Sequence, residues 1–184
     1  MEQYHKPVSL DIKEYMGQYY KPVSLDLNEF LYSHDYDSGL KLMEHSYIGN
    51  SFVSAVENLL IPGGRWHKHK IVWAGDYAQA LEGEEDNIYN LAKTKINPEK
   101  AELDEKWRYL CNHTKKLYVD YNKVIAFDNG LTFNPLPFLT CDGDGKRYYH
   151  GADDRIGSWT RDVISIEENI PEGFKEIDGD FGDL

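Results

Sequence analysis

The chain has 184 residues and a net charge of −12, so it is an acidic protein long enough to form one domain with its own core. This charge repels nucleic-acid phosphates and attracts basic partners, and we therefore expect no direct binding to free DNA. No apolar run approaches the roughly 20 residues of a membrane helix, and the first residues lack the pattern of a signal peptide. We therefore expect a cytoplasmic protein with no membrane contact.

The chain begins with an internal repeat, in which residues 3–15 are matched by residues 18–30. Two copies are too few for a solenoid. We interpret residues 1–15 as a duplicated N-terminal extension and 16–170 as a single domain. Residues 171–184 are acidic and rich in Gly, which predicts a flexible tail.

The first half of the domain contains clear element signals. Strands are predicted at 19–25 and 28–32. Asn50 offers an N-cap for a helix whose apolar residues recur at helical spacing, with Glu57 on its outer face. A Pro-Gly-Gly turn ends this helix, and the aromatic and β-branched run 68–74 follows as a strand bounded by turn residues.

The second half predicts two helices, at 86–94 and from residue 97 through Leu110, and then returns to strands. The segment 134–137 is expected to be extended. Further strands are predicted at 116–120 and 123–127, which would form a hairpin, and at 131–133, 146–149 and 161–166.

Strands lead, helices fill the middle and strands return. This order favours an α+β fold with a mostly antiparallel sheet and two to four helices. The central helices would lie between the N-terminal and C-terminal strand groups.

A pair of histidines suggests a metal site on the strand at 68–74. His67 and His69 are two residues apart, which places both imidazoles on one face of a regular strand. A third ligand would come from Asp76 or His34. The lysines between and after the histidines favour the alternative, a solvent-facing strand surface. We therefore expect no cofactor, with a divalent metal as the alternative, and the candidates for any catalysis are His67, His69 and Asp76.

A second candidate is a group of carboxylates late in the chain. Asp142 and Asp144 begin like a calcium loop, but basic residues then stand where a ligand and the obligatory Gly belong. With Asp153 and Asp154 they would suit Mg²⁺ or Mn²⁺ and phosphodiester chemistry. A solvated loop is the favoured interpretation. There is no Gly-rich phosphate loop and no nucleophile elbow.

The 14 Tyr residues, the acidity and the lack of an assembled catalytic motif favour a binding protein over an enzyme. A metal-dependent hydrolase or nuclease is one alternative. The other is a protein that sequesters a small ligand or nucleotide in a pocket lined by tryptophans. The expected contact residues are Tyr19, Tyr20, His34, Tyr36, Trp66, Trp73, Asp142, Asp144, Asp153, Asp154 and Trp159.

Three blocks carry a family resemblance: GQYYKPV at 17–23, SHDYDSGLKLMEH at 33–45 and VWAGDY at 72–77. With the late Gly-x-Trp and strand, they resemble a family of small uncharacterised proteins from phages and mobile elements of Gram-positive bacteria. The resemblance covers most of 16–166. The chain departs from the family at 145–150, where its relatives are richer in Gly.

The chain is also similar in length and style to inhibitors of type II-A CRISPR–Cas9. This resemblance implies an anti-CRISPR protein that helps a mobile element evade host defence. It would bind the basic nucleic-acid-binding surface of Cas9 or disturb its guide RNA, in the cytoplasm of the bacterial host. The expected partner is a bacterial defence protein, either Cas9 or its complex with guide RNA. The sequence leaves open whether the protein forms a homodimer.

Overall fold

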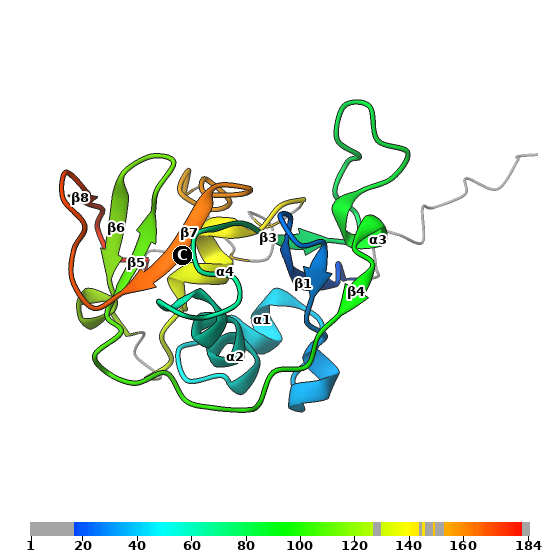
Figure 1. The fold of residues 1–184 in the computed structure, drawn as a ribbon. Coiled ribbons are helices and arrows are strands. Elements are labelled where there is room, and N and C mark those ends of the chain that lie inside the picture. The colour runs from blue at the N-terminus through cyan, green and yellow to red at the C-terminus, as the bar shows by residue number, and fades with distance from the viewer. Residues whose placement is uncertain (1–16, 127–129, 144, 146–148, 150–152, 182–184) are drawn as a thin grey trace, which may run out of the picture.

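The computed structural model describes residues 17–126, 130–143, 145, 149 and 153–181 (Figure 1). Its strands form one sheet in the order β4-β2-β1-β3-β7-β5-β6-β8. Neighbours are antiparallel except β2 with β4 and β6 with β8, so the predicted α+β fold is confirmed with a mixed sheet. The strands are β1 (Tyr20–Ser24), β2 (Glu29–Phe30), β3 (His69–Gly75), β4 (Thr94–Lys95), β5 (Tyr109–Asn112), β6 (Leu117–Asp120), β7 (Val163–Glu167) and β8 (Lys175–Glu176).

Four α-helices occur in the described residues: α1 (Leu42–His45), α2 (Ser51–Leu60), α3 (Ile88–Leu91) and α4 (Pro135–Thr140). The sequence suggested that the helices are grouped in the middle of the chain, but the structure distributes them between the strands. The pair α1 and α2 precedes β3, α3 precedes β4, and α4 precedes β7. In Figure 1, α1 and α2 lie together below the strands.

The helix α2 is the centre of the main core. Asn50 caps it as predicted, because its side-chain oxygen accepts hydrogen bonds from the backbone N–H groups of Phe52 and Val53 at 3.0 and 3.3 Å. The predicted outer position of Glu57 is wrong, since this side chain is only 4% exposed. Residues far along the chain, including Asn134 and Tyr121, cover that side of the helix, which helical periodicity does not reveal.

The strand β3 joins the two halves of the sheet. Its first two residues pair with β7, and residues 71–75 pair with β1. The predicted strand at 68–74 is therefore confirmed, and residues 71–75 of β3 are buried. A buried central strand of this kind explains the run of Ile, Val and Trp in its sequence.

The predicted helix from residue 97 to Leu110 is wrong. Residues 97–108 are irregular, and Tyr109–Asn112 forms β5. Pairing with β6 on one side and β7 on the other satisfies the backbone polar groups of β5, which outweighs the local helix preference. The hairpin predicted for residues 116–120 and 123–127 also differs from the structure. The strand β6 forms its hairpin with the preceding strand β5, and residues 121–123 form the 3₁₀ helix η3 (Tyr121–Lys123).

Other predictions for the second half of the chain also differ from the structure. The segment 134–137 is helical and not extended, because Asn134 caps α4 through a 2.9 Å bond from the Leu136 N–H group, and Pro135 occupies the first turn. At 131–133 the structure has only an isolated bridge, from Phe133 to Tyr47. The duplicated residues 1–15 and the predicted strand residues 146–148 lie outside the described residues.

Residues 171–181 belong to the segment that we expect to be a flexible tail, and part of this segment contacts the domain. The strand β8 pairs with β6. Phe181 is 2% exposed, and its ring centroid lies 4.7 Å from that of Phe138 on α4. The tail therefore contributes an aromatic side chain to the core.

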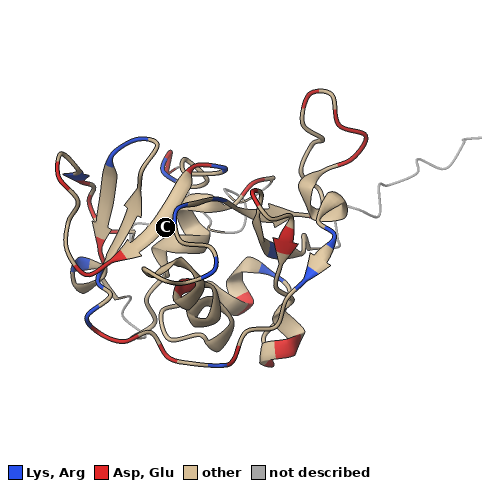
Figure 2. Ribbon diagram, viewed as in Figure 1, with Lys and Arg blue, Asp and Glu red and all other residues tan. Residues whose placement is uncertain are grey.

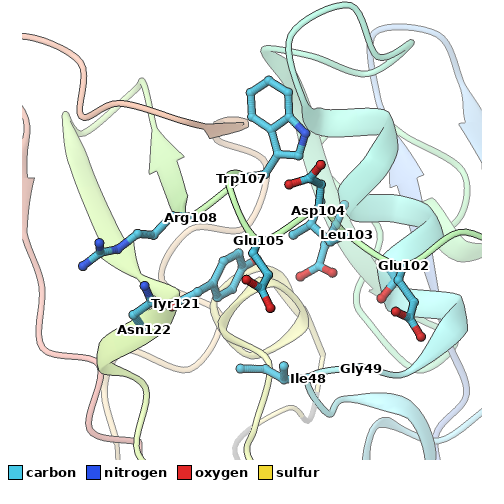
Figure 3. Close-up of a pocket in the computed structure, with 12 residues that line it drawn as sticks. Ile48, Gly49, Glu102, Leu103, Asp104, Glu105, Trp107, Arg108, Tyr121 and Asn122 are labelled. Atoms are coloured by element: carbon cyan, nitrogen blue, oxygen red, sulfur yellow. The ribbon is translucent and has the colours of Figure 1, made fainter.

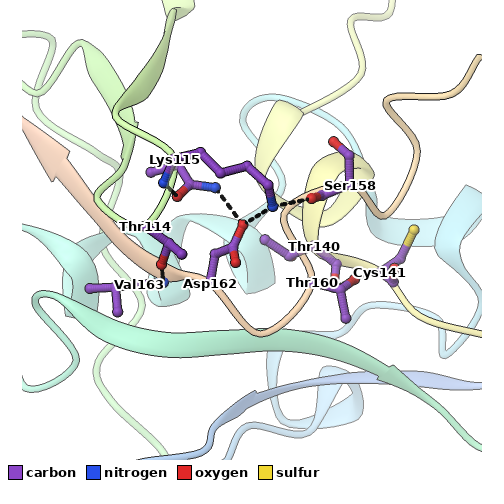
Figure 4. A network of polar contacts seen from close by, with 9 residues as sticks. Thr114, Lys115, Thr140, Cys141, Ser158, Thr160, Asp162 and Val163 are labelled. Carbon is purple, nitrogen blue, oxygen red and sulfur yellow. Dashed lines mark hydrogen bonds and ion pairs between the residues drawn. The ribbon is translucent and has the colours of Figure 1, made fainter. Parts of the chain in front are cut away.

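A polar network holds the loop after β5 against the loop before β7 (Figure 4). Asp162 accepts a 2.7 Å hydrogen bond from the Asn112 side chain and pairs with Lys115. The Lys115 ammonium group also donates to the Ser158 carbonyl oxygen at 2.7 Å. Thr160 donates to the Cys141 carbonyl oxygen at 2.7 Å, which ties the same loop to the end of α4.

A buried histidine links β3 to α1. The Trp73 indole N–H donates to His45 Nε2 at 2.9 Å, and His45 Nδ1 lies 2.9 Å from the Gly39 carbonyl oxygen. Because Nε2 accepts, the proton must be on Nδ1, which donates to Gly39. This arrangement requires a neutral imidazole. Burial lowers the pKa of His45 to about 4, partly opposed by the Gly39 carbonyl and Glu44.

We expect His45 to make stability depend on pH. Its folded pKa is about 4 and its ordinary value is 6.5, so the unfolded chain takes up the proton first. The stabilisation is therefore complete above pH 6.5 and is lost as the pH falls towards 4. Linkage gives a loss of about 2 kcal/mol between roughly pH 7 and pH 5. Urea unfolding at both pH values measures this loss, and an equal loss in His45→Gln would contradict the assignment.

Candidate functional site

The two candidate histidines contact different strands. Lys68 between them has a φ of 59°, so the chain turns before β3 begins and regular strand alternation does not apply. His67 Nε2 lies 2.9 Å from Glu167 Oε1 on β7, whereas His69 Nδ1 lies 3.0 Å from Ser24 Oγ on β1. The structure therefore does not bring the two imidazoles to a common site.

Two of the predicted carboxylates accept backbone hydrogen bonds at the C-terminal end of β3. Asp142 accepts a 2.7 Å hydrogen bond from the Gly75 N–H group, and Asp76 accepts one of 3.0 Å from the Tyr19 N–H group. Burial raises the pKa of both carboxyl groups, and these N–H groups oppose the shift. Both side chains thus hold backbone segments together at the predicted corner.

The other polar candidates are dispersed. Asp153 forms an ion pair with Arg155 at 2.6 Å. His34 is exposed in the 3₁₀ helix η2 (Ser33–Tyr36), and Asp154 is exposed after a gap in the description. Asp144 lies outside the described residues. Within the described part of the chain, no three His, Cys, Asp or Glu side chains are grouped as metal ligands.

Most of the aromatic candidates belong to the core. Each of five predicted contact residues is at most 2% exposed, and the three tryptophans at most 1%. Their rings therefore offer no surface to a partner, while Tyr19 is partly buried. The five are Tyr20, Tyr36, Trp66, Trp73 and Trp159.

A pocket that the sequence did not predict opens between α2, the irregular segment 102–108 and η3 (Figure 3). Its volume is about 640 Å³. The sequence pattern missed it because the pattern put Trp107 on a helix and Glu57 in solvent. The local signal was limited to one acidic residue, Glu57, in the helix Ser51–Leu60. This Glu57 pocket is lined by Ile48, Gly49, Ser54, Glu57, Glu102, Leu103, Asp104, Glu105, Trp107, Arg108, Tyr121 and Asn122.

Glu57 forms the buried acidic part of this pocket. Its Oε1 accepts a 2.7 Å hydrogen bond from the Asn134 side chain. Burial raises the pKa of Glu57, whereas Asn134, Tyr121 and Ser54 favour its charged form. No basic side chain of the described residues forms an ion pair with it. The pocket therefore contains a carboxyl group without a fixed counter-ion.

The one arginine that lines the pocket is already paired. Arg108 donates from Nε and Nη2 to the two carboxylate oxygens of Asp120, at 2.7 and 2.6 Å. This two-point pairing raises the pKa of Arg108 and lowers that of Asp120. The charge of Arg108 is therefore compensated outside the pocket, and the remaining charged lining residues are acidic.

A second acidic feature is the loop of residues 77–86, which projects from the body between β3 and α3 (Figures 1 and 2). The sequence has no Lys or Arg from residue 71 to residue 92. Tyr77 and Leu81 in this loop are 38% and 37% exposed. This acidic loop therefore combines negative charge with exposed apolar surface. Its carboxylates, all exposed, are Glu82, Glu84, Glu85 and Asp86.

No family model, curated protein or solved structure matches this chain. None of the helices in the described residues has the length and apolar character needed to cross a membrane.

Substitutions at Glu57 should separate its hydrogen bond from its charge. Glu57→Ala leaves the buried Asn134 amide unpaired and should lower the free energy of unfolding by about 1–3 kcal/mol. Glu57→Gln keeps a carbonyl acceptor for Asn134 and should lower the free energy of unfolding much less. Urea unfolding measures both changes, and equal losses would contradict this role.

A comparison of Glu57→Gln with the unmodified protein should also reveal that the contribution of Glu57 to stability depends on pH. The folded pKa of Glu57 is raised above its ordinary 4.5, so its stabilisation is complete below pH 4.5 and is lost as the pH rises through the folded pKa. The stability of Glu57→Gln relative to the unmodified protein should therefore increase as the pH rises.

Proposed function

We propose that this protein is a binding protein that docks on the basic, nucleic-acid-binding surface of a bacterial defence protein. The acidic loop is the observation that carries the proposal, because it projects four carboxylates from a protein whose net charge is −12. Carboxylates presented in this way are complementary to a surface that normally holds phosphates.

The geometry of the loop suits docking. Long-range attraction brings a basic surface to the loop, and charge pairs at its edge set the orientation of the complex. Tyr77 and Leu81 then supply apolar contact area, which electrostatic attraction alone does not provide. Binding of this kind weakens as salt rises, because exposed charges are screened over about 8 Å at physiological ionic strength.

Cas9, or its complex with guide RNA, is the first partner we propose, in the host cytoplasm. This choice comes from the similarity in length and style to inhibitors of type II-A Cas9, together with the resemblance of residues 17–23, 33–45 and 72–77 to proteins of phages and mobile elements. Within these blocks, Tyr20 and Trp73 are fully buried. These two residues therefore support the fold. The contact residues that we propose belong to the acidic loop, whose first residue, Tyr77, is also the last residue of the third block.

Purified protein should inhibit DNA cleavage by a type II-A Cas9–guide complex near stoichiometric ratio, and less in high salt. Glu82→Gln, Glu84→Gln and Glu85→Gln together should weaken inhibition about tenfold, since each exposed charge pair contributes roughly 0.5 kcal/mol. A plasmid-cleavage assay over a range of inhibitor concentrations measures both effects.

The matched control replaces three exposed glutamates outside the loop, Glu99, Glu168 and Glu172, by Gln. Both triple variants remove three negative charges and change the net charge from −12 to −9. The control should inhibit almost as well as the unmodified protein. Full cleavage in the presence of excess unmodified protein would refute the choice of Cas9, and equal losses in the two variants would refute the role of the loop.

A further inference from the structure

We propose that the Glu57 pocket binds a primary ammonium or guanidinium group at the end of an alkyl chain. Such a group reaches the pocket as a free small molecule, for example a diamine, or as the Lys or Arg side chain of a bound protein. The inference goes beyond the docking function, because it depends on a different surface from the acidic loop.

The size of the pocket suits a small organic group. Its volume of about 640 Å³ lies inside the range of roughly 300–1,000 Å³ that is usual for small-molecule sites. The lining combines apolar side chains, such as Ile48 and Leu103, with a few polar groups. An alkyl chain therefore finds apolar contacts, and its charged end must find a partner.

Glu57 supplies that partner. It is 4% exposed, and it lines the pocket without an ion pair to any described basic residue. Burial disfavours the ionised form of this carboxyl group, and a cation that arrives in the pocket stabilises that form. Asn134 holds one carboxylate oxygen at 2.7 Å, which fixes the position of the group. The acid is therefore positioned before the ligand arrives.

The aromatic lining favours a cation over a neutral polar group. Trp107 and Tyr121 both line the pocket, and aromatic faces attract ammonium and guanidinium groups.

The charges along the pocket disfavour an anion. Glu102, Asp104 and Glu105 come from one segment beside the pocket (Figure 3). Since Arg108 is held by Asp120, these carboxylates are not neutralised from within the lining. An anionic ligand would meet repulsion from both the segment and Glu57, whereas an organic cation is attracted by both.

Binding of 1,5-diaminopentane and of agmatine should be measured by calorimetry and by tryptophan fluorescence. The neutral control is 1,5-pentanediol, which has the same chain length. Trp107 is partly exposed while the other three tryptophans are at most 1% exposed, so an emission change that is lost in Trp107→Phe reports the pocket. We expect the diamine and agmatine to bind and the diol not to bind.

Glu57→Gln should weaken cation binding at least about tenfold, because it removes a charge-assisted contact. Glu105→Gln is a second variant at an exposed position, which tests the site even where Glu57→Gln disturbs folding. Glu84→Gln removes the same charge from the acidic loop and should change the affinity by less than about twofold. This control also separates the pocket from the docking function.

A peptide experiment distinguishes a free small-molecule cation from a side chain of a bound protein. It compares a Gly-Ser heptapeptide that has one central Lys with the same peptide that has norleucine at this position. Binding of the free cations supports a small-molecule site, and binding of the Lys peptide alone supports a side-chain site. The proposal is overturned if neither binds, if diamine and diol bind equally, or if Glu57→Gln and Glu105→Gln both leave the affinity unchanged.

Discussion

The continuity of β3 is the constraint on which the rest of the structure depends. The same strand supplies ladder hydrogen bonds to β7 with its first two residues and to β1 with its last five. It must therefore be buried and regular along most of its length, and Trp73 from its middle holds α1 through His45. Its end is equally constrained, because a Cβ atom at Gly75 would collide with the Gln18 side chain. A change in β3 would thus affect both halves of the sheet and the helix below it.

Two buried glutamates differ in whether the protein itself supplies a positively charged partner. Glu29, 4% exposed, accepts hydrogen bonds from the Arg65 guanidinium group at 2.5–3.0 Å and from the Trp66 indole at 3.0 Å. The Arg65 contact lowers the pKa of Glu29 against the effect of burial. Glu57 is equally buried but has no such cation, and burial raises its pKa. The first acid is satisfied within the fold, whereas the second opens into a pocket and retains the capacity to bind a cation.

The acidic loop and the Glu57 pocket lie on different parts of the chain and share one preference, for positive charge. The loop is exposed and suits long-range attraction, while the pocket is partly enclosed and suits a single charged group with an apolar stem. The aromatic residues that the sequence assigned to binding serve another purpose. Trp66, Trp73 and Trp159 are part of the main hydrophobic core. Abundance of aromatic residues was thus a sign of packing more than of contact.

The sequence alone determined the elements whose signals are local. The capped helix α2 follows from Asn50 and the apolar spacing behind it, and β3 follows from its run of β-branched and aromatic residues between turns. The net charge was also evident from composition. Only the tertiary structure decided that Tyr109–Asn112 is a strand, because its ladder partners lie on other segments. The Glu57 pocket depends on the same kind of information. Glu57, Trp107 and Tyr121 are far apart in the chain, and burial by distant residues leaves no periodic trace in the sequence around any one of them.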